Sequence, residues 1–410
     1  MNKLSDIYEN EARKYIIKLI DFFGCIQIEK CLKKYKESLV CAGPIYKRYH
    51  LMRRHPWWEA LIYFYELESK GKSVNKNLDL QLKILAGDGK KISVLQKMMP
   101  DSVRSKFKKD LLDPKRAFDF LFELKIAWHY LINGHSLNWY EDDNRPDFLV
   151  KTPEFDFNVE CKRVTVDASR KVWRNDFYRL VERLLPKVQK LNYKGTIDVE
   201  LDGRLHSNDQ HLEKLSTDIL AAIQNSGPSG TFDISLGKVI FDLKESNGEV
   251  VNFRERYQDL WGRKAHEAHG VIFACEGNGN PVDAVELTLK SRKSDKVLEG
   301  IKDKIKYAAT KQLPNDKPGL ISCFLEDIAD LTGLASESGL QIMSHYLLDK
   351  KEFSHVAAIS FSAENRVQKE PGAENFNSQG LLFRNPHCIY ENVQGFPFLS
   401  KEIEIAEPCN

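Results

Sequence analysis

The chain of 410 residues lacks the sequence features of several large protein classes. No apolar run is long enough to span a membrane, and acidic and basic residues throughout the first turns exclude a signal peptide in Met1–Gly24. The eight cysteines include no C-x-x-C pair, and Cys25, Cys31 and Cys41 lack the paired spacing of a zinc site. We therefore expect a cytoplasmic protein with reduced thiols and no membrane partner.

Common catalytic signatures are also missing. The segment Gly87-Asp-Gly-Lys-Lys91 is predicted to be a glycine-lysine loop, but it lacks the upstream strand and the spacing of a phosphate-binding P-loop. There is no G-x-S-x-G motif and no candidate dinucleotide loop. These absences disfavour serine hydrolases and dinucleotide-dependent enzymes. Without an ATPase motif, the chain is not expected to translocate along nucleic acid by itself.

The basic residues are unevenly distributed, although the formal net charge is only +2. Residues 1–115 contain 24 Lys/Arg and 14 Asp/Glu, a net of +10, which leaves −8 for residues 116–410. Within the second part, Cys161–Gly195 holds 10 Lys/Arg and 3 Asp/Glu, a net of +7. Such segments suit a polyphosphate partner. Solvated helix faces in a lysine-rich protein would give the same composition.

The length and the spacing of apolar residues predict several structural regions. Residues 1–115 are expected to form a helical, basic N-terminal region that binds DNA or mediates dimerisation. Residues 116–227 are expected to hold the catalytic part of an α/β core, 228–295 a β-rich insertion, and 296–410 the rest of the core and the C-terminal region. The alternation of helices and strands predicts a mixed β-sheet flanked by helices.

The catalytic part begins with a helix over 116–133, which should end at Gly134. Strands are predicted over 136–140, 147–151 and 155–164, followed by a long amphipathic helix over 168–191. The short turn between the second and third strands favours antiparallel pairing.

Three residues in these strands carry the chemistry that hydrolysis of a phosphodiester needs. Strand alternation places Glu160 and Lys162 on one face of the third strand, while apolar neighbours occupy the other. Antiparallel pairing allows Asp147 to approach Glu160. Glu123 borders the apolar stripe of the preceding helix, where a carboxylate is costly unless a cation or a donor meets it. Carboxylates at such a point can hold a divalent cation.

This arrangement resembles the PD-(D/E)XK nuclease superfamily in the Pro146-Asp147 dipeptide, the Glu160-Cys-Lys162 tripeptide and Glu123 on the preceding helix. The resemblance covers about 117–201 and extends to the strands after 318. It implies a restriction-endonuclease-like fold in which Asp147, Glu160 and the carbonyl of Cys161 bind Mg²⁺, or Mn²⁺ in its place, with Glu123 completing the site. Lys162 would orient the attacking water or stabilise the charge that develops on the phosphate. Arg163, Arg170, Lys171 and Arg174 follow the catalytic strand and are candidates for contacts with the nucleic-acid backbone.

Other interpretations of these residues exist. An acid-x-lysine triplet also occurs at Asp242-Leu-Lys244, with Asp233 and Glu213 upstream, but it lacks the Pro-Asp dipeptide and a following basic helix. Asp147, Glu160 and Lys162 would alternatively be surface charges on a half-exposed pair of strands.

The sequence thus predicts a metal-dependent endonuclease acting on duplex DNA as a homodimer, with a separate recognition or ATPase subunit as a further possible partner. The abundance of Lys, Asn and Ile fits a prokaryotic or phage source, where defence against foreign DNA is the expected role. A catalytically silent binding protein of the same fold and an RNA nuclease are the alternatives.

Overall fold

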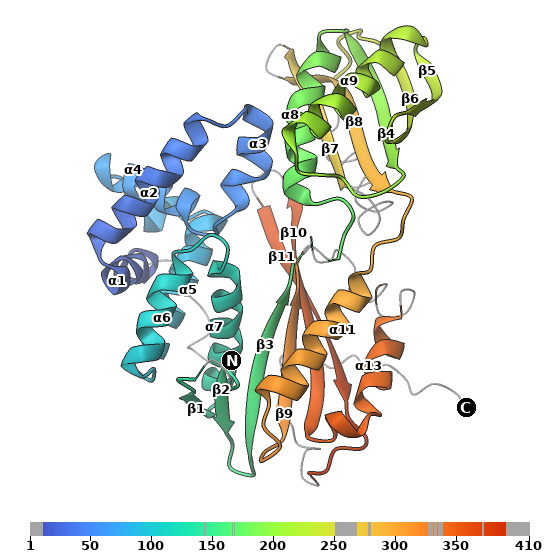
Figure 1. Cartoon of the computed structure of the whole chain (residues 1–410). Coiled ribbons are helices and arrows are strands. Elements are labelled where there is room, and N and C mark those ends of the chain that lie inside the picture. The colour runs from blue at the N-terminus through green and yellow to red at the C-terminus, as the bar shows by residue number, and fades with distance from the viewer. Residues whose placement is uncertain are drawn as a thin grey trace. The chain divides into compact units, whose positions relative to one another are not determined.

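The computed structural model describes residues 11–142, 145–165, 167, 169–250, 269–277, 280–326, 331, 334, 339–370 and 373–390. They form a mixed α/β protein with two mixed sheets flanked by helices, which confirms the predicted class (Figure 1). The chain divides into two compact units. Unit 1 comprises the described residues of Met1–Val40, Met52–Thr165 and Leu298–Asn410, and unit 2 those of Cys41–Leu51 and Val166–Val297.

The first part of unit 1 is helical, as predicted. Its helices are α1 (Ala12–Phe23), α2 (Cys25–Val40), α4 (Trp58–Ser69), α5 (Leu80–Leu95), α6 (Asp101–Leu111) and α7 (Ala117–Ile132), with short 3-10 turns at Leu51–Arg53 and Asn75–Asn77. These helices share one apolar core with the first three strands, so 1–115 is not a separate domain. Trp57 and Trp58 are buried in this core.

The segment that was predicted to be a glycine-lysine loop is part of helix α5. Asp79 begins this helix by accepting a hydrogen bond from the Leu82 N–H at 2.8 Å. Gly89 is needed for packing, since a Cβ atom there would lie 2.2 Å from the Tyr15 carbonyl oxygen on α1. The loop prediction was wrong because close packing of two helices outweighed the low helix propensity of glycine.

The sheet of unit 1 has the order β1-β2-β3-β9-β10-β11. Its strands are β1 (Ser136–Trp139), β2 (Phe148–Lys151), β3 (Asp156–Val164), β9 (Gly319–Leu325), β10 (Val356–Glu370) and β11 (Ala373–Arg384). β1, β2 and β3 pair antiparallel, β3, β9 and β10 pair parallel, and β11 returns antiparallel to β10. Helix α7 ends before Gly134, which has a φ of +88°, as the sequence predicted.

Two helices follow the insertion in unit 1. They are α11 (Val297–Tyr307), which continues as a π-helical turn over Ala308–Gln312, and α13 (Leu340–Leu348), followed by a 3-10 turn at Lys351–Phe353. Figure 1 shows α11 and α13 over one face of the sheet. The connection from β3 to its parallel neighbour β9 runs through unit 2 and then through α11, which belongs to unit 1.

Unit 2 has its own sheet, in the order β5-β6-β4-β8-β7. Its elements are α3 (Pro44–Tyr49), α8 (Arg174–Gln189), β4 (Tyr193–Leu201), α9 (Asp209–Asn225), β5 (Ser229–Ile234), β6 (Gly237–Glu245), β7 (His269–Gly277) and β8 (Asn280–Ser291). β4 lies between β6, antiparallel, and β8, parallel. The insertion therefore begins near 166 rather than at 228, and helix α8 and strand β4 belong to it and not to the catalytic part.

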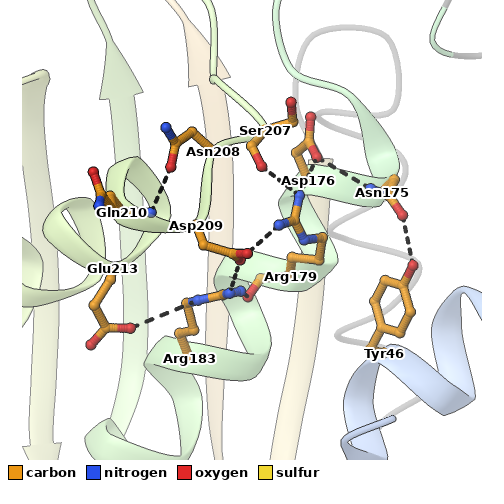
Figure 2. Close-up of polar contacts among 10 residues, drawn as sticks. All are labelled: Tyr46, Asn175, Asp176, Arg179, Arg183, Ser207, Asn208, Asp209, Gln210 and Glu213. Atoms are coloured by element: carbon orange, nitrogen blue, oxygen red, sulfur yellow. Dashed lines mark hydrogen bonds and ion pairs between the residues drawn. The ribbon is translucent and has the colours of Figure 1, made fainter. Parts of the chain in front are cut away.

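Ion pairs and hydrogen bonds hold the helices of unit 2 together (Figure 2). On α8, Arg179 and Arg183 both contact Asp209 at the start of α9, and Lys187 contacts Glu213 at 2.8 Å. The short helix α3 joins this unit through two bonds to α8. The Tyr46 N–H donates to Glu182 at 2.8 Å, and the Tyr46 hydroxyl donates to Asn175 at 2.7 Å.

Candidate functional site

The predicted site residues meet at an incomplete edge of strand β3. Strand β2 has 4 residues and β3 has 9, and β2 pairs only with Asp156–Val159. Beyond Val159, β3 pairs with β9 on one side, and no described strand pairs with its other side. The backbone groups of Cys161 and Arg163 point to that unpaired side, because those of Asn158 and Val164 bond toward β9.

Asp147 lies at this edge, immediately before β2. Its N–H donates to the Val159 carbonyl at 3.1 Å, although Val159 is already the partner of Phe148. Two residues of one strand thus face one of the other, as in a β-bulge. The Asp147 carboxylate accepts the N–H of Cys161 at 2.6 Å. The side chain therefore takes the place of a missing strand partner, and Asp147 lies next to Glu160 as the sequence predicted.

Glu160 and Lys162 point to the face of the sheet opposite α7. Their apolar neighbours Phe157 and Val159 are in the core that α7 shares. The Lys162 amine donates to Oε1 of Glu160, while Oε2 of Glu160 is buried and has no hydrogen-bond partner. Only 1% of Glu160 is exposed. A buried carboxylate oxygen without a donor is costly, so this atom has an unmet need for a cation or a water.

Burial raises the pKa values of the three carboxyl groups at this edge. Burial, with the neighbouring charge of Asp147, raises the pKa of Glu160 to about 8. Burial raises the pKa of Asp147 to about 6, against the lowering effect of the Cys161 N–H and of Lys162. Burial and the charges of Asp147 and Glu160 raise the pKa of Glu123 well above its usual range. The raised pKa values favour the protonated forms of these acids, and a bound cation would lower those pKa values.

Lys162 keeps its charge in this site. Burial acts to lower the pKa of Lys162, but the Glu160 and Asp147 carboxylates outweigh it, and the net shift is upward. The amine is therefore charged near neutral pH and available to a phosphate oxygen or a water molecule.

The donor set fits a magnesium ion on chemical grounds. Among the described residues, no three His, Cys, Asp or Glu side chains gather closely enough to form a metal site by themselves. Magnesium does not need three, since it is held by one or two carboxylates and keeps several waters. Asp147, the unpartnered oxygen of Glu160, and the Cys161 carbonyl on the unpaired edge could supply such a set, with Glu123 reached through water.

The four predicted backbone-binding residues are divided between the two units. The Arg163 guanidinium donates to Asp119 at 3.0 Å and to Glu326 at 2.9 Å, and 10% of its side chain is exposed. Strand alternation points Arg163 toward α7. Because the two carboxylates already neutralise its charge, a contact between Arg163 and a phosphate is disfavoured. Arg170, Lys171 and Arg174 belong to unit 2, where Arg170 is buried and the other two are half-buried.

The rival triplet of unit 2 shows none of the features of this site. Asp233, Asp242 and Lys244 are exposed on β5 and β6, and Glu213 forms ion pairs with Lys187 and Arg183. Exposed carboxylates of this kind are hydrated by solvent, so they do not require a bound cation.

Two lysines near the site were not predicted. Lys106 on α6 acts to lower the pKa values of Asp147 and Glu123, and Lys304 on α11 donates to the main-chain carbonyl of Arg163. Both lie on amphipathic helices among other lysines, so neither carried a distinguishing signal in the sequence.

Comparisons with known proteins assign the chain to no family. No protein-family model, curated protein or solved structure matches the chain. In the described part of the chain, no helix combines the length and the apolar character that crossing a bilayer requires.

Proposed function

We propose that this chain is a magnesium-dependent nuclease with a restriction-endonuclease-like core. The core would consist of α7, β1, β2, β3, α11 and β9, with unit 2 inserted between β3 and α11. The order of these elements and the antiparallel–antiparallel–parallel pairing of β1, β2, β3 and β9 support this proposal. The helix that follows β3 in the core is then α11 rather than α8.

One observation carries the functional proposal. Asp147 and Glu160 lie side by side at an unpaired strand edge, where Glu160 keeps a buried oxygen without a partner beside the charged amine of Lys162. A buried carboxylate oxygen without a partner is uncommon in native proteins, and a bound ion is one explanation for it. Burial raises the pKa values of both groups, and the charge of Asp147 adds to the shift at Glu160, a perturbation typical of functional sites.

The roles of the residues follow from their positions. Asp147 is oriented by the Cys161 N–H, and Glu160 is oriented by Lys162, so both carboxylates are fixed before a ligand arrives. When bound, Mg²⁺ would polarise the phosphate and stabilise the charge that develops on it. The charged amine of Lys162 would donate a hydrogen bond to a phosphate oxygen or to the attacking water. The resemblance to the PD-(D/E)XK superfamily implies products with 5′-phosphate and 3′-hydroxyl ends.

Cleavage of supercoiled plasmid in Mg²⁺, Mn²⁺ or EDTA tests the proposal. Wild type should cut with either metal and not in EDTA. Lys162→Met and Asp147→Asn should each lower the rate at least a hundredfold, the usual cost of losing such a group. Lys151→Met, at the exposed end of β2, is the matched control and should cut like wild type. Equal cutting by wild type and both site variants would refute the assignment.

A catalytically silent protein of the same fold is the second candidate. It is favoured by the direct pairing of Lys162 with Glu160 and by the lack of a three-side-chain metal group among the described residues. Parallel assays on duplex DNA, single-stranded DNA and RNA decide between the silent protein, a DNA nuclease and an RNA nuclease. Duplex DNA as substrate, a homodimer, a recognition or ATPase subunit, and a role in defence stay predictions.

A further inference from the structure

Lys304 occupies a position at the catalytic edge that its packing alone does not explain. It lies on α11, and its amine donates to the main-chain carbonyl of Arg163 at 2.8 Å. That carbonyl points to the unpaired side of β3, the same side as the Cys161 N–H that Asp147 accepts. Lys304 and Asp147 therefore reach one strand edge.

The spacing along this edge suits a phosphodiester. The carbonyls of Cys161 and Arg163 are two residues apart on an extended strand, which separates them by about 7 Å. A phosphate group that shares a bound cation with the Cys161 carbonyl through one oxygen could thus present another oxygen to the Lys304 amine. Lys162, between the two residues, points to the face that α11 covers.

The Lys304 ammonium lacks a negative partner. Among the described residues, the Arg163 carbonyl is its one hydrogen-bond acceptor, and no carboxylate forms an ion pair with it. The nearby Asp119 is bonded to Arg163 at 3.0 Å. A lysine amine has three donors, so two are available. Placing a partly buried ammonium beside the positive Lys162 and Arg163 is costly unless an anion joins them.

The electrostatics agree with this geometry. Burial lowers the pKa of Lys304, Asp119 acts against that shift, and the positive charge of Lys162 adds to it. An anion bound between the amines of Lys162 and Lys304 would offset the repulsion between their charges.

We propose that Lys304 binds a non-bridging oxygen of the nucleic-acid phosphate held at the catalytic edge, and so forms with Lys162 a two-amine phosphate subsite. The proposal rests on the proposed function for its substrate class. It assigns Lys304 to substrate binding, whereas Lys162 acts at the reacting group.

Binding of a fluorescent duplex oligonucleotide in EDTA, followed by anisotropy over a salt series, tests this without cleavage. Lys304→Met keeps the aliphatic stem and removes the charge. It should weaken binding roughly tenfold, as expected for a lost charged hydrogen bond. The slope of log affinity against log salt should fall by about 0.9, the contribution of one phosphate contact on duplex DNA. Lys304→Arg should retain most of the affinity.

Lys306→Met is the matched control, since it makes the same change two residues along α11, at an amine that forms no hydrogen bond or ion pair with any described residue. It should leave affinity and slope unchanged. The thermal midpoint of Lys304→Met is measured as well, because this change also removes the donor to the Arg163 carbonyl. If the midpoint falls, Lys304→Gln, which keeps a donor and removes the charge, replaces it in the binding assay.

The outcomes separate the two proposals. Unchanged affinity and slope in the Lys304 variant overturn the subsite even if wild type cuts DNA. A reduced slope in Lys304→Met, together with a wild type that binds the oligonucleotide but never cuts DNA, supports the subsite and refutes the nuclease. A wild type that binds no oligonucleotide overturns the subsite directly.

Discussion

Replacing Glu160 by glutamine should stabilise the metal-free protein, by an amount that grows with pH. Glutamine keeps the shape of the side chain, and its oxygen can still accept the hydrogen bond from Lys162. It removes a buried charge whose folded pKa is about 8, against 4.5 in the unfolded chain. A carboxyl group with a raised folded pKa favours the fold only while it is protonated. That stability is complete below pH 4.5 and is lost as pH rises through about 8.

The magnitude follows from 1.36 kcal/mol per pKa unit. Ionisation of Glu160 costs the fold on the order of 1 kcal/mol at pH 5.5 and several kcal/mol at pH 9. The difference in the free energy of unfolding between Glu160→Gln and wild type should therefore widen by about 3 kcal/mol over this range. Excess Mg²⁺ should stabilise wild type at high pH and leave the variant unchanged, because binding to the folded state alone adds stability.

Urea denaturation in EDTA and in Mg²⁺ at pH 5.5, 7 and 9 measures these differences. Glu154→Gln, in the exposed turn between β2 and β3, is the control. Its free energy of unfolding should equal that of wild type at all three pH values. A constant difference between Glu160→Gln and wild type across the pH range would refute the reasoning. So would a variant that is less stable than wild type at pH 9.

Three further predictions concern stability away from the site. Burial, with the charge of Arg170, lowers the pKa of His269 to about 3, so the stability contributed by the neutral imidazole is complete above pH 6.5 and is lost as pH falls. Hydrogen exchange in α8 should show that unit 2 loses about 1.4 kcal/mol of stability between pH 7.5 and 5.5. Exchange free energies in α8 that do not change with pH would contradict this. Asp79→Ala should cost about 1 kcal/mol in urea denaturation by removing the cap of α5, whereas Asp79→Asn should cost little. Glu213→Ala breaks a half-exposed ion pair with Lys187 and should cost less than about 1 kcal/mol, with no cost at high salt.

Local pattern was sufficient to predict the elements around the site. Alternation along Asp156–Val164 separates the apolar side chains from Glu160 and Lys162 whatever the strand pairs with, because the two-residue period belongs to the strand itself. Gly134 ends α7 because it can adopt a positive φ, which is also a local property. The juxtaposition of Asp147 and Glu160 followed from the short antiparallel connection.

The pairing of distant strands could not be predicted in the same way. Ile197, Val199 and Leu201 of β4 would bury equally well against helices in either sheet, so the pattern shows a strand without naming its neighbours. Only the structure shows that β4 joins β8 and that β9, more than 150 residues after β3, takes the place beside it. For Arg163, alternation gave the right face of β3, but the partners Asp119 and Glu326 on that face were not visible in the sequence.

The difference in length between β2 and β3 accounts for the site more directly than any single residue does. A strand edge without a partner leaves N–H and C=O groups that must be satisfied by other means. Here Asp147 satisfies the Cys161 N–H, and Lys304 satisfies the Arg163 carbonyl. If β2 began a few residues before Phe148 and so paired with β3 beyond Val159, its backbone would occupy both positions, and neither charged side chain would be needed at the edge. Because β2 begins only at Phe148, side chains of opposite charge from two elements lie along the edge of β3, next to a buried carboxylate oxygen that lacks a partner.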